Sequence, residues 1–186
     1  TTTRWDNYIQ AIRLTEPDKW ASKAVFPASF SGGVLIPSGG SSYVYGLKGT
    51  AFWRYNIGTD AWSETDVADP TSVSSGIGSS SAILVGADTI YALGGSNLHF
   101  YKYTISTNTW TTLTDAPTLV GSSGALGYPS TGSGDCIYRL NGSTFDAYSI
   151  SGNNWNSTCA DPTNPPAATG AGVSMTWANV PGYTDY

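Results

Sequence analysis

The chain has 186 residues, of which 40% are hydrophobic and 13% aromatic, enough for one domain with a buried core. Only 11% of the residues are charged, so the polar surface must consist mainly of uncharged groups such as Ser and Thr. The formal charge is −5 with scattered Lys and Arg, and no apolar run approaches the roughly 20 residues that span a bilayer, so we expect neither a nucleic-acid partner nor membrane insertion.

The first recognisable element ends at Asp18-Lys19-Trp20, with Pro27 a short distance beyond it. Ile9, Ile12 and Leu14 precede this ending and form an irregular apolar strand pattern. The [DN]-x-W ending and the following proline recur in the rest of the chain. We therefore treat this element as the end of a first repeat.

Three later segments superpose without gaps on the pattern F-x-x-Y-x-I-x-x-[DN]-x-W, namely 52–62, 100–110 and 145–155. Each follows a run of β-branched and aromatic residues and a turn that contains glycine. Such runs are typical of strands, and glycine supplies the positive φ of a tight hairpin. Each repeat therefore predicts antiparallel strands joined by hairpins, the second of which closes at [DN]-x-W.

The aromatic residues of the repeat are expected to pack the faces of the sheets. Phe and Tyr three positions apart point to opposite faces of a strand, whereas Tyr and Ile two apart share one face. Both faces are therefore bulky and apolar, which fits small sheets packed face to face around an axis. The predicted packing residues are Trp20, Phe52, Tyr55, Trp62, Phe100, Tyr103, Trp110, Phe145, Tyr148 and Trp155.

The tryptophans set the length of the repeat. Trp20, Trp62, Trp110 and Trp155 recur at intervals of 42, 48 and 45 residues, which matches a four-stranded propeller blade and exceeds a hairpin repeat. We therefore predict an all-β, four-bladed β-propeller of four-stranded antiparallel blades, forming a single domain over 1–186.

One blade is predicted to be shared between the two end segments of the chain. The N-terminal segment resembles the third and fourth strands of a blade, and the C-terminal segment resembles the first and second. Paired within one molecule they close a ring, and paired between molecules they build a string of propellers. The predicted blades are 1–25 plus 166–186, 28–68, 73–116 and 120–162.

The segment Ile90-Tyr91-Ala92-Leu93-Gly94-Gly95, with Tyr103 and Trp110 after it, resembles the kelch repeat of β-propellers. The resemblance covers about 28–162, and it implies a kelch-like propeller with four repeats. The double glycine is complete only in this repeat.

The sequence offers no catalytic constellation. Some kelch-like proteins are copper oxidases, but such a site needs several imidazole and phenol ligands, and His99 is the one histidine of the chain. We expect His99 to have a structural or surface role. No nucleophile elbow of the G-x-S-x-G type occurs. We therefore predict that the protein is not an enzyme and has no catalytic residue, metal site or cofactor.

Acidic residues recur near the prolines that connect the repeats, at Asp66, Asp69, Asp115 and Asp161. Pseudo-symmetry would place them around one face, where carboxylates can hold Ca²⁺. Capping of Asp-Pro and Asp-x-Pro turns is the interpretation that we prefer.

Cys136 is expected to begin a second strand and Cys159 to lie in a fourth. Strands two apart are separated by nearly 10 Å, whereas a disulfide needs Cα atoms within about 7 Å. We therefore do not expect a bond unless the outer strand bends. Asn141 and Asn156 match the N-glycosylation pattern, although Asn141 is also a natural hairpin residue.

Aromatic residues outside the repeat pattern are candidates for ligand binding. Trp53 and Tyr101 directly follow the repeated Phe, and Tyr128 and Trp177 have no place in the repeat. Sugar rings stack on such surfaces. The alternative is that these aromatics fill gaps between blades or bury at contacts with a neighbouring molecule.

Two functions remain open at this stage. The first is a non-catalytic structural module, extracellular or on the cell surface, that self-associates or is tandemly repeated in a fibre or layer. Its partners would be copies of itself. The second is a carbohydrate-binding lectin or adhesin.

Overall fold

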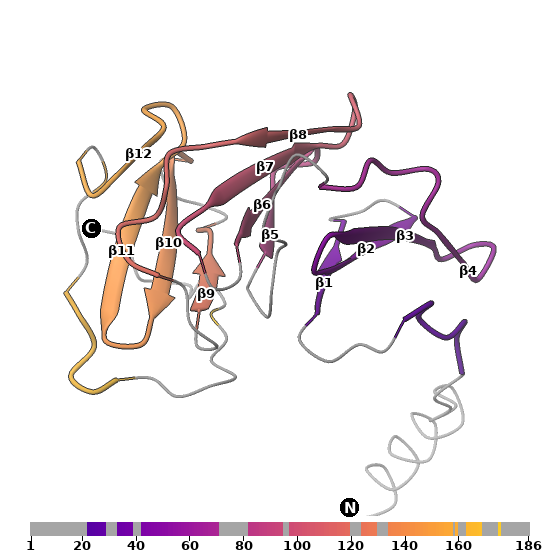
Figure 1. Ribbon diagram of the computed structural model, residues 1–186, viewed down its shortest axis with the longest axis horizontal. Coiled ribbons are helices and arrows are strands. Elements are labelled where there is room, and N and C mark those ends of the chain that lie inside the picture. Colours follow the sequence, from indigo (N-terminus) through magenta and orange to yellow (C-terminus); the bar gives the residue numbers. More distant parts are fainter. Residues whose placement is uncertain are drawn as a thin grey trace, which may run out of the picture.

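The described part of the molecule consists of strands and turns and contains no helix (Figure 1). It therefore also contains no apolar helix of membrane-spanning length. The residues that the computed structural model describes are 22–28, 33–38, 42–70, 82–94, 97–119, 124–129, 134–157, 159, 163–168 and 175.

Three antiparallel sheets of four strands follow one another along the chain, as the repeat predicts, and each is a simple meander. The first sheet contains β1 (Val34–Pro37), β2 (Tyr43–Lys48), β3 (Ala51–Asn56) and β4 (Ala61–Ser63). The second contains β5 (Ala82–Val85), β6 (Thr89–Leu93), β7 (Phe100–Thr104) and β8 (Thr109–Thr112). The third contains β9 (Gly124–Gly127), β10 (Cys136–Asn141), β11 (Thr144–Ser149) and β12 (Asn154–Trp155).

Consecutive sheets pack face to face through equivalent aromatic side chains. Phe52 of the first sheet meets Tyr103 and Trp110 of the second edge to face, with ring centroids 4.8 and 5.3 Å apart. Phe100 of the second sheet meets Tyr148 of the third at 4.8 Å. Aliphatic residues complete two hydrophobic clusters, one at each junction. Edge-to-face pairs of this kind add stability beyond the area that they bury.

The first strands of the three sheets lie near one another, because β5 contacts both β1 and β9. The three described sheets do not close a ring, and the β1–β4 and β9–β12 sheets lie at opposite ends of the described structure (Figure 1). The predicted blades 28–68, 73–116 and 120–162 each contain one sheet. The predicted fourth blade, 1–25 plus 166–186, falls almost wholly outside the described residues, and so does Trp20.

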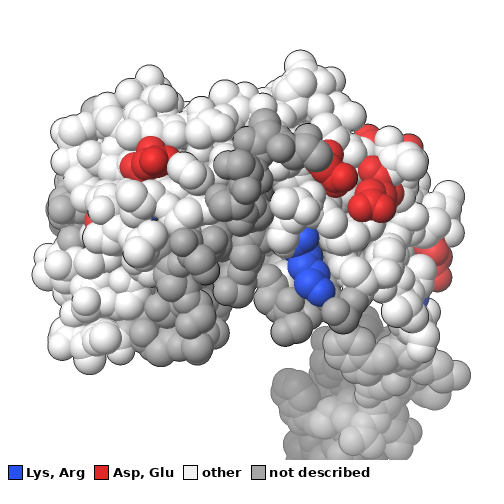
Figure 2. Space-filling model, in the orientation of Figure 1, with Lys and Arg blue, Asp and Glu red and all other residues white. Residues whose placement is uncertain are grey.

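On the described part of the surface shown in Figure 2, charged side chains are sparse, with acidic side chains in separate patches and the largest basic patch near the centre. This agrees with the low charged fraction of the sequence. On this face, uncharged groups therefore make up most of the described surface.

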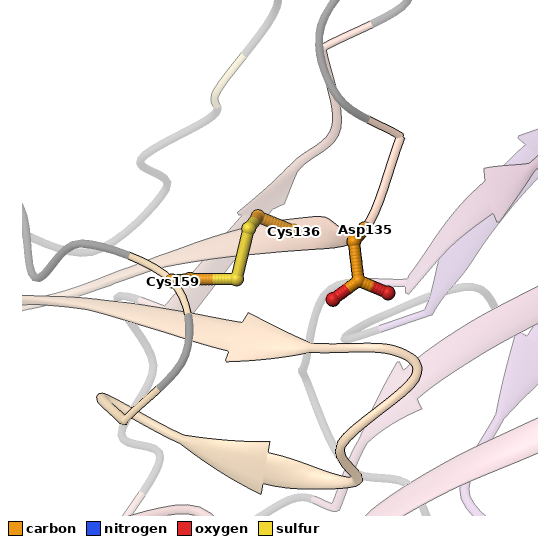
Figure 3. Close-up of side chains that lie close together, drawn as sticks. All are labelled: Asp135, Cys136 and Cys159. Atoms are coloured by element: carbon orange, nitrogen blue, oxygen red, sulfur yellow. A yellow bond between two sulfur atoms is a disulfide. The ribbon is translucent and has the colours of Figure 1, made fainter.

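Cys136 and Cys159 form a disulfide with Cα atoms 6.0 Å apart, so the expectation that they stay unbonded is wrong (Figure 3). That expectation placed Cys159 within the fourth strand. The fourth strand ends at Trp155, and Cys159 lies in the connection beyond it. The connection brings Cys159 back to the start of β10 and so overcomes the distance between strands.

Replacing both cysteines with Ala should lower the free energy of unfolding by about 3 kcal/mol, because the bond closes a loop with a sequence separation of 23. Urea unfolding of the variant and the wild type measures the difference. Reductant should destabilise the wild type and leave the double variant unchanged. Equal stability of the two oxidised proteins would contradict the prediction.

Candidate functional site

The [DN]-x-W ending of each repeat binds the main chain of the preceding connection. In the second sheet, Asn108 Oδ1 accepts a hydrogen bond from the main-chain N–H of Ala68 at 2.6 Å. The indole N–H of Trp110 donates to the carbonyl of Ala68 at 2.9 Å. Ala68 lies in the connection that leaves the first sheet. We call this arrangement the main-chain clasp, and the residue that it binds the held residue.

The clasp recurs at the other two described [DN]-x-W endings. Asn153 accepts from the N–H of Thr114 at 3.0 Å, and Trp155 donates to the carbonyl of Thr114 at 3.1 Å. In the first sheet Asp60 and Trp62 hold Ala24, and the corresponding distances are 2.9 and 3.1 Å. Each sheet therefore forms two hydrogen bonds with the main chain of the connection that precedes it.

The tyrosine of the repeat also donates a hydrogen bond to the Asp or Asn of the clasp. The hydroxyl groups of Tyr55, Tyr103 and Tyr148 donate to the same Oδ1 atoms, at 2.5, 2.8 and 2.8 Å. Burial raises the pKa of Tyr103 to about 12, so this phenol stays a donor at neutral pH. The repeated Tyr and the repeated Asp or Asn therefore act as one unit.

The backbone explains why only Asp or Asn occupies this position. Asp60, Asn108 and Asn153 have φ values of 52°, 53° and 48°, in the left-handed region. Asp and Asn tolerate this region better than other residues with a side chain, and glycine would lose the acceptor oxygen. The position thus needs both the conformation and the side-chain oxygen.

Two further aspartates close turns inside single sheets. Asp88 accepts from the N–H and the hydroxyl of Ser106, both at 2.7 Å. Asp135 accepts from the same groups of Ser151 at 2.8 and 3.0 Å, and from the hydroxyl of Ser149 at 2.7 Å. These hydrogen bonds, led by that of Ser149, lower the pKa of Asp135.

Asp135, Cys136 and Cys159 are the one group of three potential metal-ligand residues in the described part of the chain, with candidate atoms within 4.8 Å of one another (Figure 3). The two sulfur atoms are bonded to each other, so neither is a thiolate. The Asp135 carboxylate is occupied by its serine donors. The group therefore provides structural bonds and no metal site is assigned to it.

Three of the four acidic residues near the connections are described, and each of the three has its own protein partner. Asp66 pairs with Arg54 at 2.9 Å, and Asp69 accepts from the N–H of Phe52 at 3.1 Å. Asp115 contacts Nδ1 of His99 at 2.8 Å. The bond to Phe52 reaches a strand residue 17 positions away, so capping of the Asp-Pro and Asp-x-Pro turns stays a prediction. Asp161 lies outside the described residues.

The third sheet contains a buried ion pair that the sequence analysis missed. Arg139 is fully buried, and its Nε donates to Asp146 Oδ2 at 3.0 Å while Nη1 donates to the carbonyl of Thr118 at 2.9 Å. The equivalent cross-strand pairs are small-with-aromatic, namely Gly46 with Trp53 and Ala92 with Tyr101. The sequence contains a signal for this pair. In the third repeat Arg139 stands where the other repeats have Gly46 or Ala92, and Asp146 stands where they have Trp53 or Tyr101.

Two of the four predicted ligand-binding aromatics are buried. Trp53 is 6% exposed, with the ring of Phe26 edge-on at 4.7 Å, and Tyr101 is 2% exposed. Neither offers a face on which a sugar ring could stack, so both fit the alternative of filling space between elements. Tyr128 is half-buried and its hydroxyl donates to the carbonyl of Gly134 at 2.9 Å. Trp177 lies outside the described residues.

Both glycosylation candidates use their amide nitrogen inside the protein. Asn141 Nδ2 donates to the carbonyl of Leu119 at 2.8 Å, and Asn156 Nδ2 donates to Asp146 Oδ1 at 3.1 Å. Asn156 is exposed. Glycosylation at either position stays a prediction.

The first-sheet clasp should open in acid before the other two. The hydrogen bond from Tyr55, followed by that from the N–H of Ala24, lowers the pKa of Asp60 below its ordinary value of 3.8. Because the folded-state pKa is depressed, the stabilisation is present above pH 3.8 and is lost as the pH falls through the lowered value. The amide protection factor of Ala24, measured by hydrogen exchange, should fall in this window.

Ala68 and Thr114 provide internal controls, because Asn108 and Asn153 hold them and do not titrate. Asp60→Asn should abolish the acid dependence at Ala24. A parallel loss of protection at all three held residues would contradict this prediction.

Comparison with known proteins supports the fold and leaves the function open. No family model and no curated protein matches the chain. The chain is similar to a solved structure of unknown function from Bacteroides thetaiotaomicron, with a TM-score of 0.50 and 11% identity over 77% of this chain and 41% of that one. The chain thus spans about two fifths of that protein's length. The structure of a 2S albumin seed protein from Dolichos matches with 14% identity over 67% of this chain and 65% of that chain. Its TM-score of 0.38 is too low to indicate a shared fold.

Proposed function

We propose that this chain is a non-catalytic structural module of the cell exterior that associates with copies of itself. The main-chain clasp carries the proposal. The most regular polar residues of the repeat bind the neighbouring connection and join one sheet to the next. Because the repeated residues join one repeat to the next, they favour a structural role and allow further repeats to be added.

The proposal includes a kelch-like propeller of four blades, with 1–25 and 166–186 supplying the fourth. Two observations support it. Consecutive sheets pack through equivalent Phe, Tyr and Trp residues, and their first strands approach one another. Ala24, which follows Trp20 in the sequence, is held by the first sheet just as Ala68 and Thr114 are held by the second and third. The segment before Ala24 thus occupies the sequence position of a preceding blade.

The disulfide and the surface composition support an exterior location. Disulfides form and persist in oxidising compartments and are rare in the reducing cytosol. A surface with few charges and many hydroxyl groups suits contacts between copies, because no strong like-charge repulsion has to be overcome.

The internal roles of the polar side chains support a non-catalytic role. The carboxylates of Asp88 and Asp135 close turns, and His99 pairs with Asp115. The buried Arg139 is paired with Asp146 and with the main chain of Thr118. Each of these groups is used to hold the fold.

Light scattering coupled to size-exclusion chromatography tests self-association directly. Purified protein should change from monomers to larger assemblies as its concentration rises, and negative-stain electron microscopy should show ordered strings or layers. A mass that stays monomeric over a wide concentration range, with no ordered assembly, would rule out the self-associating module.

A further inference from the structure

Two asparagines of the third sheet match the N-x-[ST] pattern of N-glycosylation, and the proposed function makes no use of either. Asn141 ends β10, where the hairpin to β11 begins. Asn156 directly follows β12, the edge strand of the sheet. The pattern alone does not distinguish the two positions. The structure does, because the two side-chain amides have different partners.

The amide nitrogen of Asn141 is fully used inside the protein. A side-chain amide has two N–H groups. Asn141 Nδ2 donates to the carbonyl of Leu119 at 2.8 Å and to Thr118 Oγ1 at 3.2 Å. The side chain is half-buried. Replacement of either hydrogen by a larger group would therefore remove a hydrogen bond to the connection that arrives from the second sheet.

Thr118 is also an acceptor for the buried Arg139. Nη1 of the arginine donates to the carbonyl of Thr118 and Nη2 to its hydroxyl oxygen, both at 2.9 Å. Arg139 is fully buried and paired with Asp146. Displacement of Thr118 would leave part of a buried cation without acceptors, which costs more than the loss of an exposed hydrogen bond. A sugar on Asn141 is therefore expected to destabilise the folded chain.

The amide of Asn156 is anchored mainly through its oxygen. Oδ1 accepts from the main-chain N–H of Ala147 at 2.9 Å, and the main-chain N–H of Asn156 donates to the carbonyl of Ala147 at 2.7 Å. Among the described residues, Nδ2 makes one hydrogen bond, to Asp146 Oδ1 at 3.1 Å. One of the two amide hydrogens is therefore left for substitution. The residue is exposed and follows an edge strand, so a bulky group can extend into solvent.

We propose that Asn156 is the asparagine at which the folded chain carries an N-linked sugar, and that Asn141 cannot carry one without loss of stability. The donor is a sugar linked through a diphosphate to its carrier. A bond forms between Nδ2 and C1 of the sugar while the C1–O bond to the diphosphate breaks. The diphosphate leaves with the electron pair, and the amide nitrogen gives up one proton to solvent. The second N–H of Asn156 stays to donate to Asp146.

This inference rests on the exterior location in the proposed function. N-linked sugars belong to secreted proteins, and the Cys136–Cys159 bond also requires an oxidising compartment. The inference does not rest on self-association. The two can therefore fail separately.

Secretion of the full chain from a eukaryotic host tests the inference by the occupancy of each asparagine. Peptide N-glycosidase in heavy-oxygen water turns each occupied Asn into a labelled Asp, which peptide mass spectrometry locates. Asn156 should be labelled in most molecules. Asn141 should be unlabelled, or its glycosylated fraction should unfold at a lower urea concentration than the rest.

Two substitutions remove one glycosylation pattern each and leave both amides in place. Ser143→Ala changes an exposed residue and abolishes the pattern at Asn141. Thr158, which lies outside the described residues, is changed to Ala only to abolish the pattern at Asn156. Glycosylated Ser143→Ala should have the same urea midpoint as the double variant, which carries no sugar. Thr158→Ala should be secreted without sugar, or a sugar on Asn141 should lower its midpoint.

Light scattering on these samples separates the inference from the proposed function. A sugar on Asn156 in a protein that stays monomeric supports the inference and contradicts self-association. A protein without sugar on Asn156 overturns the inference, whatever its state of assembly. The inference is also overturned if the sugar on Asn156 lowers the urea midpoint, or if Asn141 carries a sugar with no loss of stability.

Discussion

The rest of the structure depends on the hydrogen bonding of one main-chain residue between each pair of sheets. Burial of the hydrophobic clusters that contain Phe52 and Phe100 stabilises the two junctions, but the hydrophobic effect is not directional. The clasp is directional, because an Asp or Asn oxygen and an indole N–H must meet the N–H and the carbonyl of the same residue. It therefore sets which connection lies against which sheet and in what register the aromatic rings meet.

Much of the fold could be predicted from the sequence because the side chains of the repeat are of the types that favour strands and hairpin turns. The alternation of Phe, Tyr and Ile and the glycine turns predict the meander sheets, and the repeat pattern predicts packing roles for Phe52, Tyr103 and Trp110, which are in contact in the structure. The held residues could not be found in this way. Ala24, Ala68 and Thr114 share no side-chain property, since the clasp binds their main chain, and a sequence pattern does not record main-chain contacts.

The wrong expectation about the disulfide and the features that the repeat pattern does not reveal have equally specific physical causes. The distance argument against the Cys136–Cys159 bond assumed that the fourth strand continues to Cys159, whereas that strand ends at Trp155 and the chain turns back. Trp53, for which ligand binding stays a prediction, lies against the ring of Phe26. Phe26 fits there because Gly46 opposite has no side chain: a Cβ at Gly46 would lie 2.5 Å from the Phe26 ring. Arg139 occupies the equivalent place in the third sheet, and its charge requires Asp146 beside it.

The most direct test of this account is the exchange rate of the indole N–H groups of Trp62, Trp110 and Trp155, measured by NMR in the folded protein. All three donate to a main-chain carbonyl of the preceding connection. The account predicts that they exchange slowly and that Asn108→Ala speeds the exchange of Trp110 more than that of Trp62 or Trp155. Exchange of all three at the rate of a free indole, in a protein whose strand amides are protected, would contradict it.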